Sequence, residues 1–348
     1  MDPSKQSPSS LSRRGLIQGT LAGTALAPLL GAATASDAAG KAEGEGSAVR
    51  GGFSQDDILI RLHSPAVADP VKLLFVADTH LFRDDDRGAP YREFSGRMAK
   101  GYNQTKHFRT QNTTNPEACF EETLETAKSA GVDAVVLAGD IVSFPSEAAI
   151  EWVMARLEQT GVPWLYTAGN HDWHYEGMEG SSAELRSAWI EKRLLPLYEK
   201  RDPMMSALEV AGVKVLVIDN STYEILPEQL EFFRQQAASG QPMVLCVHIP
   251  LYAPGRPVGF GCGHPDWGEA ADKNFAIERR PKWRERHTDT TMEFHREVFA
   301  APNLLGVFAG HTHRLSLDVL NGIPQVVAGA NATGAHLLVE VLPMSVAG

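Results

Sequence analysis

The stretch LLGVFAGHTH (residues 304–313) joins an uninterrupted apolar run to two histidines that are separated by one residue. A run without alternating polar positions is typical of a strand that is buried on both faces. Burial gives no reason for such a strand to end in His-x-His, whereas imidazole is a common metal ligand. His311 and His313 are therefore candidate metal ligands at the end of a predicted strand.

Similar apolar runs occur at residues 71–80, 134–140, 164–172, 213–221 and 243–250. Between several of them lie helix signals, such as Asn115 before Pro116 and the capping box Ser181-x-x-Glu184. These signals predict helices over residues 115–131, 146–161, 181–198 and 227–240. Strands that alternate with helices predict an α/β architecture.

Polar residues gather where these predicted strands end. A single Asp or His in such a place usually serves a turn, but here they follow five of the six runs. In α/β sheets, binding sites form beyond the carboxyl ends of the strands. The candidate metal ligands are Asp78, His80, Asp140, Asn170, His248, His311 and His313.

The mixture of imidazole and carboxylate suits Fe, Mn or Zn better than Mg or Ca. Residues i and i+2 of an extended segment face the same way, so Asp78 and His80 are expected to address one ion. Two catalytic ions lie about 3.5–4 Å apart, which requires a shared carboxylate. Asp140 is the expected bridge, and we predict two divalent transition-metal ions.

The order of five motifs resembles that of the calcineurin-like metallophosphoesterases. These motifs are D-x-H (78–80), G-D (139–140), G-N-H-D (169–172), the strand-end His248 and G-H-x-H (310–313). The resemblance implies an α/β (α+β) fold in four layers: a β-sandwich of mixed sheets flanked by helices. Residues 315–329 and 334–343 look like the closing strands of that sandwich.

The resemblance also implies roles for the candidate residues. One ion is assigned Asp78, His80, Asp140 and His313, and the other Asp140, Asn170, His248 and His311. His171 is implied as a general acid or electrostatic aid near the leaving group, with Asp172 accepting its other ring proton. The implied reaction is in-line attack on phosphorus by a metal-bridging hydroxide, without a covalent intermediate.

Two departures separate the chain from known branches of that family. No tyrosine stands three residues after Asp140, so the tyrosinate ligand of purple acid phosphatases is absent. Ile249 follows His248 where class III cyclic-nucleotide phosphodiesterases have a second histidine. The predicted substrate is a small phosphomonoester or phosphodiester. The alternative is a binding or scaffold protein that keeps the fold without turnover; the complete ligand set and His171 disfavour it.

Residues 81–114 and 251–290 are longer than a connecting loop requires, and such segments usually serve function or are disordered. The first is polar yet contains several aromatic residues, which favours an ordered flap. Cations in these segments could contact a phosphate, although a solvated surface is an equal explanation. The candidates are Arg97, Lys106, Arg109 and Arg256.

The first 35 residues are predicted to be an export signal. Arg13 and Arg14 precede an Ala-rich apolar stretch that ends in the A-x-A cleavage site at residues 33–35. Ordinary secretion is the alternative to twin-arginine export. Glycine, threonine and Pro28 interrupt the stretch, which argues against a membrane anchor. A disordered lead-in (36–51) and one domain (52–348) are expected to follow. The protein is expected to be periplasmic or secreted and to meet the twin-arginine export machinery in transit.

The formal net charge of −11 repels polyanions and anionic membrane surfaces, which argues against nucleic-acid polymers as partners. A small phosphorylated substrate held by local cations is compatible with it. The three cysteines show no CxxC spacing and predict neither a disulfide framework nor a zinc finger.

Overall fold

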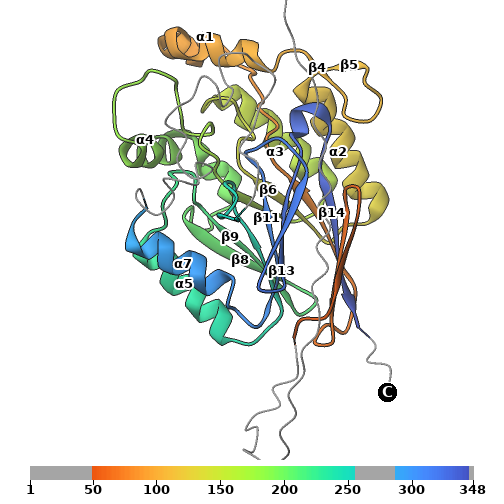
Figure 1. The fold of residues 1–348 in the computed structure, drawn as a ribbon. Helices are drawn as coiled ribbons and strands as arrows, with labels where there is room; N and C mark the ends of the chain where they lie inside the picture. The colour runs from red at the N-terminus through yellow and green to blue at the C-terminus, as the bar shows by residue number, and fades with distance from the viewer. Residues whose placement is uncertain (1–48, 255–286, 345–348) are drawn as a thin grey trace, which may run out of the picture. The chain divides into compact units, whose positions relative to one another are not determined.

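Two six-stranded sheets form the centre of the computed structural model, which describes residues 49–254 and 287–344 (Figure 1). The first sheet has the order β1 (Phe53–Asp56), β2 (Leu59–Ser64), β14 (Leu337–Pro343), β3 (Val71–Val76), β6 (Ala134–Ala138) and β7 (Trp164–Thr167). The second has the order β12 (Ser316–Leu320), β13 (Ile323–Val327), β11 (Leu304–Ala309), β10 (Met243–Cys246), β9 (Val213–Ile218) and β8 (Met205–Val210). The predicted export signal and Arg256 lie outside the described residues, so both stay predictions.

Both sheets are mixed, as expected. Strands β3, β6 and β7 run parallel in the first sheet, and β9, β10, β11 and β13 run parallel in the second. Antiparallel partners are β14 beside β3, β12 beside β13 and β8 beside β9. All six strands predicted from the apolar runs are present, and the parallel arrangement brings their carboxyl ends to one edge of each sheet.

Helices form on the signals that predicted them. Asn115 caps α2 (Pro116–Ala130) and Ser146 caps α3 (Glu147–Thr160), each by accepting a hydrogen bond from a backbone N–H of the first turn. Ser181 opens α4 (Ser182–Trp189), which continues through the π-helical turn η2 (Ile190–Leu194) and the 3₁₀ turn η3 (Leu195–Tyr198). Helices α5 (Pro227–Ala238) and α7 (Asp289–Val298) pack together through Phe233 and Phe294, whose ring centroids lie 5.4 Å apart.

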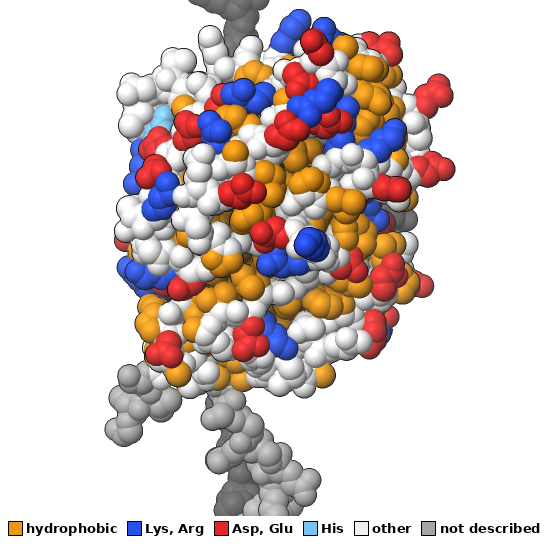
Figure 2. Space-filling view, turned by 180° about the vertical axis from the view of Figure 1, so that it is seen from behind, with side chains coloured by type: hydrophobic (Ala, Val, Ile, Leu, Met, Phe, Trp, Pro, Cys, Tyr) orange, Lys and Arg blue, Asp and Glu red, His pale blue; other side chains and the backbone are white. Residues whose placement is uncertain are grey.

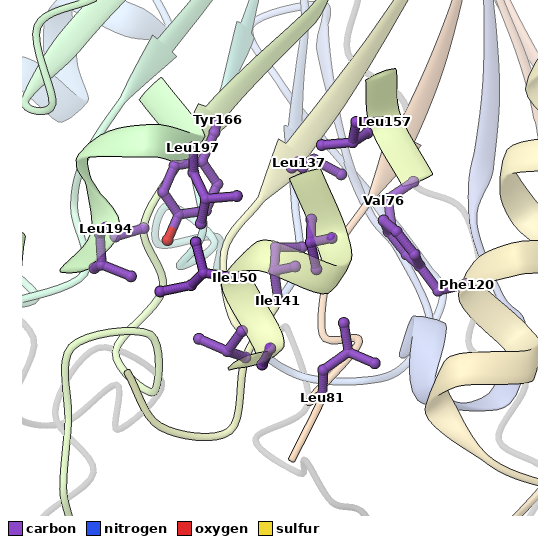
Figure 3. Packing of buried hydrophobic residues seen from close by; sticks show 14 of the residues in the cluster. Val76, Leu81, Phe120, Leu137, Ile141, Ile150, Leu157, Tyr166, Leu194 and Leu197 are labelled. Carbon is purple, nitrogen blue, oxygen red and sulfur yellow. The ribbon is translucent and has the colours of Figure 1, made fainter. Parts of the chain in front are cut away.

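Three buried clusters separate four layers. Alternate residues of β3 face opposite ways: Leu73 and Phe75 pack against the second sheet, whereas Leu74 and Val76 pack under α2 and α3. Figure 3 shows the outer cluster, with Val76 near Phe120 of α2. A third cluster joins the second sheet to α5 and α7. The helix–sheet–sheet–helix order confirms the predicted four-layer sandwich.

The first inserted segment, residues 81–114, has secondary structure of its own. It forms η1 (Asp86–Tyr91), α1 (Arg92–Gly101) and a short hairpin of β4 (Thr105–Lys106) and β5 (Thr113–Thr114), which lie at the top of Figure 1. Tyr91 stacks on Tyr175 with ring centroids 5.1 Å apart, which joins the segment to the main domain. Of the second segment, only residues 251–254 and 287–290 are described.

The predicted lead-in (36–51) overlaps the described part of the chain by three residues, 49–51. Gly51 donates to the carbonyl of His63 and His63 donates to the carbonyl of Gly52, both at 2.8 Å, so this part of the chain already runs beside β2. Backbone pairing with β2 supplies order that small, polar residues do not signal by themselves.

The surface carries both signs of charge. Figure 2 shows Lys and Arg side chains interspersed with Asp and Glu on one face, without a continuous basic region there. Within the described ranges, no helix has the length and apolar character needed to span a membrane. Cys119 and Cys246 are buried free thiols, as expected for small apolar fillers.

Candidate metal centre

The chain turns sharply where the strands end. Five of the seven predicted ligands have positive φ, at values of 51–70°: Asp78, His80, Asp140, His311 and His313. The expectation that the Asp78–His80 pair lies in extended backbone is therefore wrong. Left-handed backbone at a residue other than glycine costs about 1–3 kcal/mol and persists only where the surroundings enforce it. Side chains two residues apart converge here because of these turns and not because of strand pleating.

Hydrogen bonds between neighbouring strand ends hold the left-handed turns in place. The backbone N–H of Asp78 donates to Gly139 O (3.0 Å), and that of His80 donates to Asp140 O (2.9 Å). The N–H of His311 donates to Asp78 Oδ2 (2.8 Å), which links the second sheet to the first. The turns at Asp78, His80 and His311 are thus each held by a residue of another motif.

Glycines of the motifs allow these loops to approach one another. A Cβ at Gly169 would lie 2.2 Å from Asp140 Oδ1, and one at Gly310 would lie 2.4 Å from Ala77 Cβ. Both distances are far below van der Waals contact, so a side chain at either position would push the strand ends apart. The glycines of G-N-H-D and G-H-x-H are therefore required by packing.

The ligand atoms form two adjacent groups. In the first, His313 Nε2 lies 3.2 Å from Asp78 Oδ1 and 3.1 Å from His80 Nε2. In the second, His248 Nε2 lies 3.2 Å from Asp140 Oδ2, and the His248 and His311 rings are 5.1 Å apart. Within each group the ligand atoms lie less than 4.8 Å from one another. Six of the seven predicted ligands meet in this way.

Asp140 lies between the two groups. Its Oδ2 is 3.2 Å from His248 Nε2 of one group and 4.0 Å from His80 Nε2 of the other. Its Oδ1 accepts a hydrogen bond from the backbone N–H of His171 at 2.8 Å. One carboxylate oxygen thus faces histidines of both groups, which is the position expected of a bridging ligand.

The buried atoms of these groups fit a pair of cations. Asp78 Oδ1 and Asn170 Oδ1 are both buried and accept no hydrogen bond from any described residue. An unsatisfied buried acceptor costs about 1–3 kcal/mol, and a metal ion would satisfy it. Asn170 belongs to the loop whose next residue, His171, donates to Asp140. The loop that carries the seventh predicted ligand is therefore held beside the shared carboxylate.

Two of the histidines, His80 and His311, are held in the neutral form that binds metal, whereas at His248 burial is outweighed by the charge of Asp140, which raises the pKa to about 10. Burial lowers the pKa of His80 and of His311 well below the usual value, so both imidazoles are neutral. The Nδ1 of His248 lies 2.9 Å from the carbonyl oxygen of Ala138, to which it can donate. Such a bond to a backbone oxygen leaves Nε2 as the ligand atom and fixes the plane of the ring.

His171 lies beside both ligand groups. Its ring nitrogen is within 4.8 Å of ligand atoms of His80 and Asp140, and its ring centroid is 5.1 Å from that of His80. The side chain is half-buried, so it keeps access to solvent. This is a suitable position for a group that acts on a substrate bound at the centre.

Asp172 is placed differently from the expected partner of the His171 ring. Its Oδ2 accepts hydrogen bonds from the N–H groups of Asp140 (2.9 Å) and Gly169 (2.7 Å), and its Oδ1 accepts one from Val142 (2.9 Å). The His171 ring is not among its hydrogen-bond partners. Burial, and next the charge of Asp140, raise the pKa of Asp172 to about 7. The carboxyl group is occupied by backbone donors, so Asp172 fixes the loops that carry Asp140 and Asn170.

Tyr102, which the sequence identified only as an aromatic residue of the inserted segment, contacts both histidines of the first group. Its ring is parallel to that of His80 within 1°, with centroids 3.9 Å apart, and it meets His313 edge-on at 5.9 Å. Tyr102 is almost fully buried. The inserted segment is therefore part of the wall of the metal centre.

Tyr102→Leu should weaken metal binding about tenfold, the lower end of the usual effect of residues that orient ligands. The reason is that His80 loses the surface that fixes its ring plane. Titration of the metal-free protein against a chromogenic chelator measures this affinity. Tyr102→Phe keeps the stacked ring and should bind like the unsubstituted protein; equal affinity in Tyr102→Leu would contradict the orienting role.

Side-chain amides fix the segment that follows His248. Asn220 donates to Ile249 O (2.7 Å) and accepts from Ile249 N (2.9 Å). Gln325 pairs in the same way with both backbone groups of Leu251, at 2.8 and 2.7 Å. Asn220 lies at the end of the apolar run 213–221, a place where polar residues gather, but nothing in the sequence around Gln325 indicates this role.

The predicted substrate cations differ in position. Lys106 lines a cavity together with His313. The Arg109 guanidinium pairs with Asp57 at 3.3 Å and lies over the Phe108 ring, so that its charge is engaged by the protein itself. Arg97 lies on α1.

The chain has layers of helix, sheet, sheet and helix, and two ligand groups that share one aspartate at the strand ends. This combination defines the class of metallophosphoesterases. The family model described as calcineurin-like phosphoesterase matches residues 71–315, and the chain belongs to this family. This finding agrees with the resemblance read from the motifs.

Among solved structures, a dimetal phosphatase from Danio rerio is similar to the chain at 11% identity and a TM-score of 0.47, over 76% of this chain and 89% of that one. A purple acid phosphatase from yellow lupin (Lupinus luteus) seeds is similar at 13% identity and a TM-score of 0.46, over 80% of this chain and 47% of that one. Comparison with curated protein sequences finds no significant match.

Proposed function

We propose that the protein hydrolyses a small phosphoric ester with the help of two divalent transition-metal ions, Fe, Mn or Zn. The observation that carries the proposal is the position of Asp140 Oδ2, which faces a histidine of each ligand group. A mixed set of imidazole and carboxylate ligands favours these metals over Mg or Ca.

Two such ions, when bound, polarise the phosphoryl oxygens and activate water as the nucleophile. The protein's own contribution begins with the rigid strand ends, which set the spacing of the two ligand groups. Asp172 and Gly169 keep the loop of His171 against Asp140. The His171 ring, beside both groups, then donates a proton to the leaving oxygen or stabilises its charge.

The alternative from another class is a binding or scaffold protein with the same fold. Binding alone does not require a half-buried histidine beside a complete set of ligands. The position of His171 within reach of His80 and Asp140 therefore favours turnover.

Metal add-back tests the proposal. Protein stripped by a chelator should release no p-nitrophenol, and activity should return with Mn, Zn or Fe. The ratio of rates on p-nitrophenyl phosphate and bis-p-nitrophenyl phosphate separates a monoesterase from a diesterase. Absence of release with every metal, in protein that rebinds two equivalents, would favour the scaffold alternative.

A further inference from the structure

A cavity of about 470 Å³ adjoins the metal centre, which is within the range of small-ligand pockets. His313 of the first ligand group forms part of its wall. The inserted segment supplies Tyr102, Lys106 and Thr113, and the loop after β13 supplies Ala330 and Ala332. The cavity thus lies between the common scaffold and the segment that exceeds it.

The cavity and the metal centre share two side chains. His313 Nε2 lies 3.2 Å from Asp78 Oδ1, and Tyr102 stacks on His80 while it also lines the cavity. An ester whose phosphorus lies at the ligand groups therefore has this space beside it. The phosphorus is bound at the strand ends, so the cavity is available to the substituent of the ester.

The lining has an apolar and a polar side. Tyr102, Ala330 and Ala332 form one small buried cluster, which suits a slim apolar body. Lys106 and Thr113 are exposed on the β4–β5 hairpin, where they can meet a polar end. None of the described residues around the cavity is an aspartate or a glutamate, although the whole chain has a net charge of −11.

Lys106 is the lysine among the residues that line this cavity. In the part of the chain that the structure describes, its ammonium makes no ion pair, whereas Arg109 on the same hairpin is paired with Asp57. A lysine without a counter-ion beside a carboxylate-free cavity attracts an anion. Its exposure limits the gain, because solvent and salt screen such contacts.

We propose that the substrate is a phosphoric ester whose substituent carries a second anionic group, phosphate or carboxylate, which Lys106 binds in this cavity. This inference rests on the proposed function of the metal centre. Lys106 would contact the substituent away from the phosphorus, so this contact would stabilise the ground state and the transition state equally. Its loss should therefore raise KM and leave kcat unchanged.

Three aryl phosphates provide the test: 4-carboxyphenyl phosphate, its neutral amide analogue 4-carbamoylphenyl phosphate, and 1,4-phenylene bisphosphate. If the protein cleaves only diesters, their methyl esters replace them. Lys106→Met should raise KM for the two anionic substrates about three- to tenfold, in line with a partly exposed ion pair. KM for the amide should stay the same. The larger of the two increases identifies the preferred anion, and both should shrink at high salt.

Two further variants control for charge and site. Lys106→Arg keeps the cation and should retain the preference. Lys100→Met removes an exposed lysine of α1 in the same inserted segment and should change none of the three KM values. If Lys106→Met changes KM equally for the amide and the carboxylate, or changes neither KM, the inference is overturned. Hydrolysis of the amide in the same experiment would still uphold the proposed function. Failure of all three substrates with every metal would overturn both.

Discussion

Asp140→Asn should abolish the binding of both ions and reduce ester hydrolysis by roughly 10³-fold or more, which corresponds to about 4 kcal/mol. Asp140 Oδ2 is the atom that faces both ligand groups, and a neutral amide there cannot neutralise two cations. Asparagine still offers an acceptor in the place of Oδ1, so the hydrogen bond from His171 N can remain. Metal content after dialysis and kcat/KM on p-nitrophenyl phosphate are the measurements.

Asp69→Asn is the matched control, because it removes one carboxylate from an exposed loop between β2 and β3. It should keep two equivalents of metal and full activity. Retention of two ions by a folded Asp140→Asn protein would show that this aspartate is not shared between them.

His171→Gln should keep the metal content and lower kcat by roughly 10²–10⁴-fold, the usual contribution of a general acid. The ring lies beside both ligand groups, and the backbone N–H of residue 171, which the substitution keeps, donates to Asp140. The loss should be largest for alkyl esters, whose leaving groups need a proton, and smallest for p-nitrophenyl esters. A series of leaving groups of rising pKa measures this dependence.

His63→Gln is the control variant, because it removes a histidine from β2, away from the metal centre. It should leave the rates of hydrolysis unchanged. If His171→Gln hydrolyses alkyl esters as fast as the unsubstituted protein does, the proposed role of the ring is wrong.

The strands and the ligands could be predicted because each carries a local signal. Continuous apolar runs mark β3, β6 and β11, and polar residues at their ends mark the centre. In β1 half-buried residues alternate with exposed ones, and in β2 they alternate with buried ones. Neither strand therefore contains a continuous apolar run. Local signals were thus sufficient for the buried parallel strands but not for the edge of the first sheet.

The finer structure of the centre depends on contacts between distant residues. Aspartate and histidine adopt left-handed backbone here because other motifs hold them, so residues 78–80 alone predict an extended segment. Thr79 donates to Asn331 at 3.1 Å, across 252 positions of sequence. The Asp172 side chain likewise accepts a hydrogen bond from a distant residue, Val142, although its place in G-N-H-D predicts a partner one residue away.

Neither sheet possesses a whole binding site. Asp78 and His80 come from the first sheet but need His313 from the second, and Asp140 needs His248 and His311 in the same way. Each of the two ligand groups is therefore complete only when the two sheets are packed together. A bound ion would therefore join residues of both sheets at this edge, where the hydrogen bond from His311 N–H to Asp78 Oδ2 already links them.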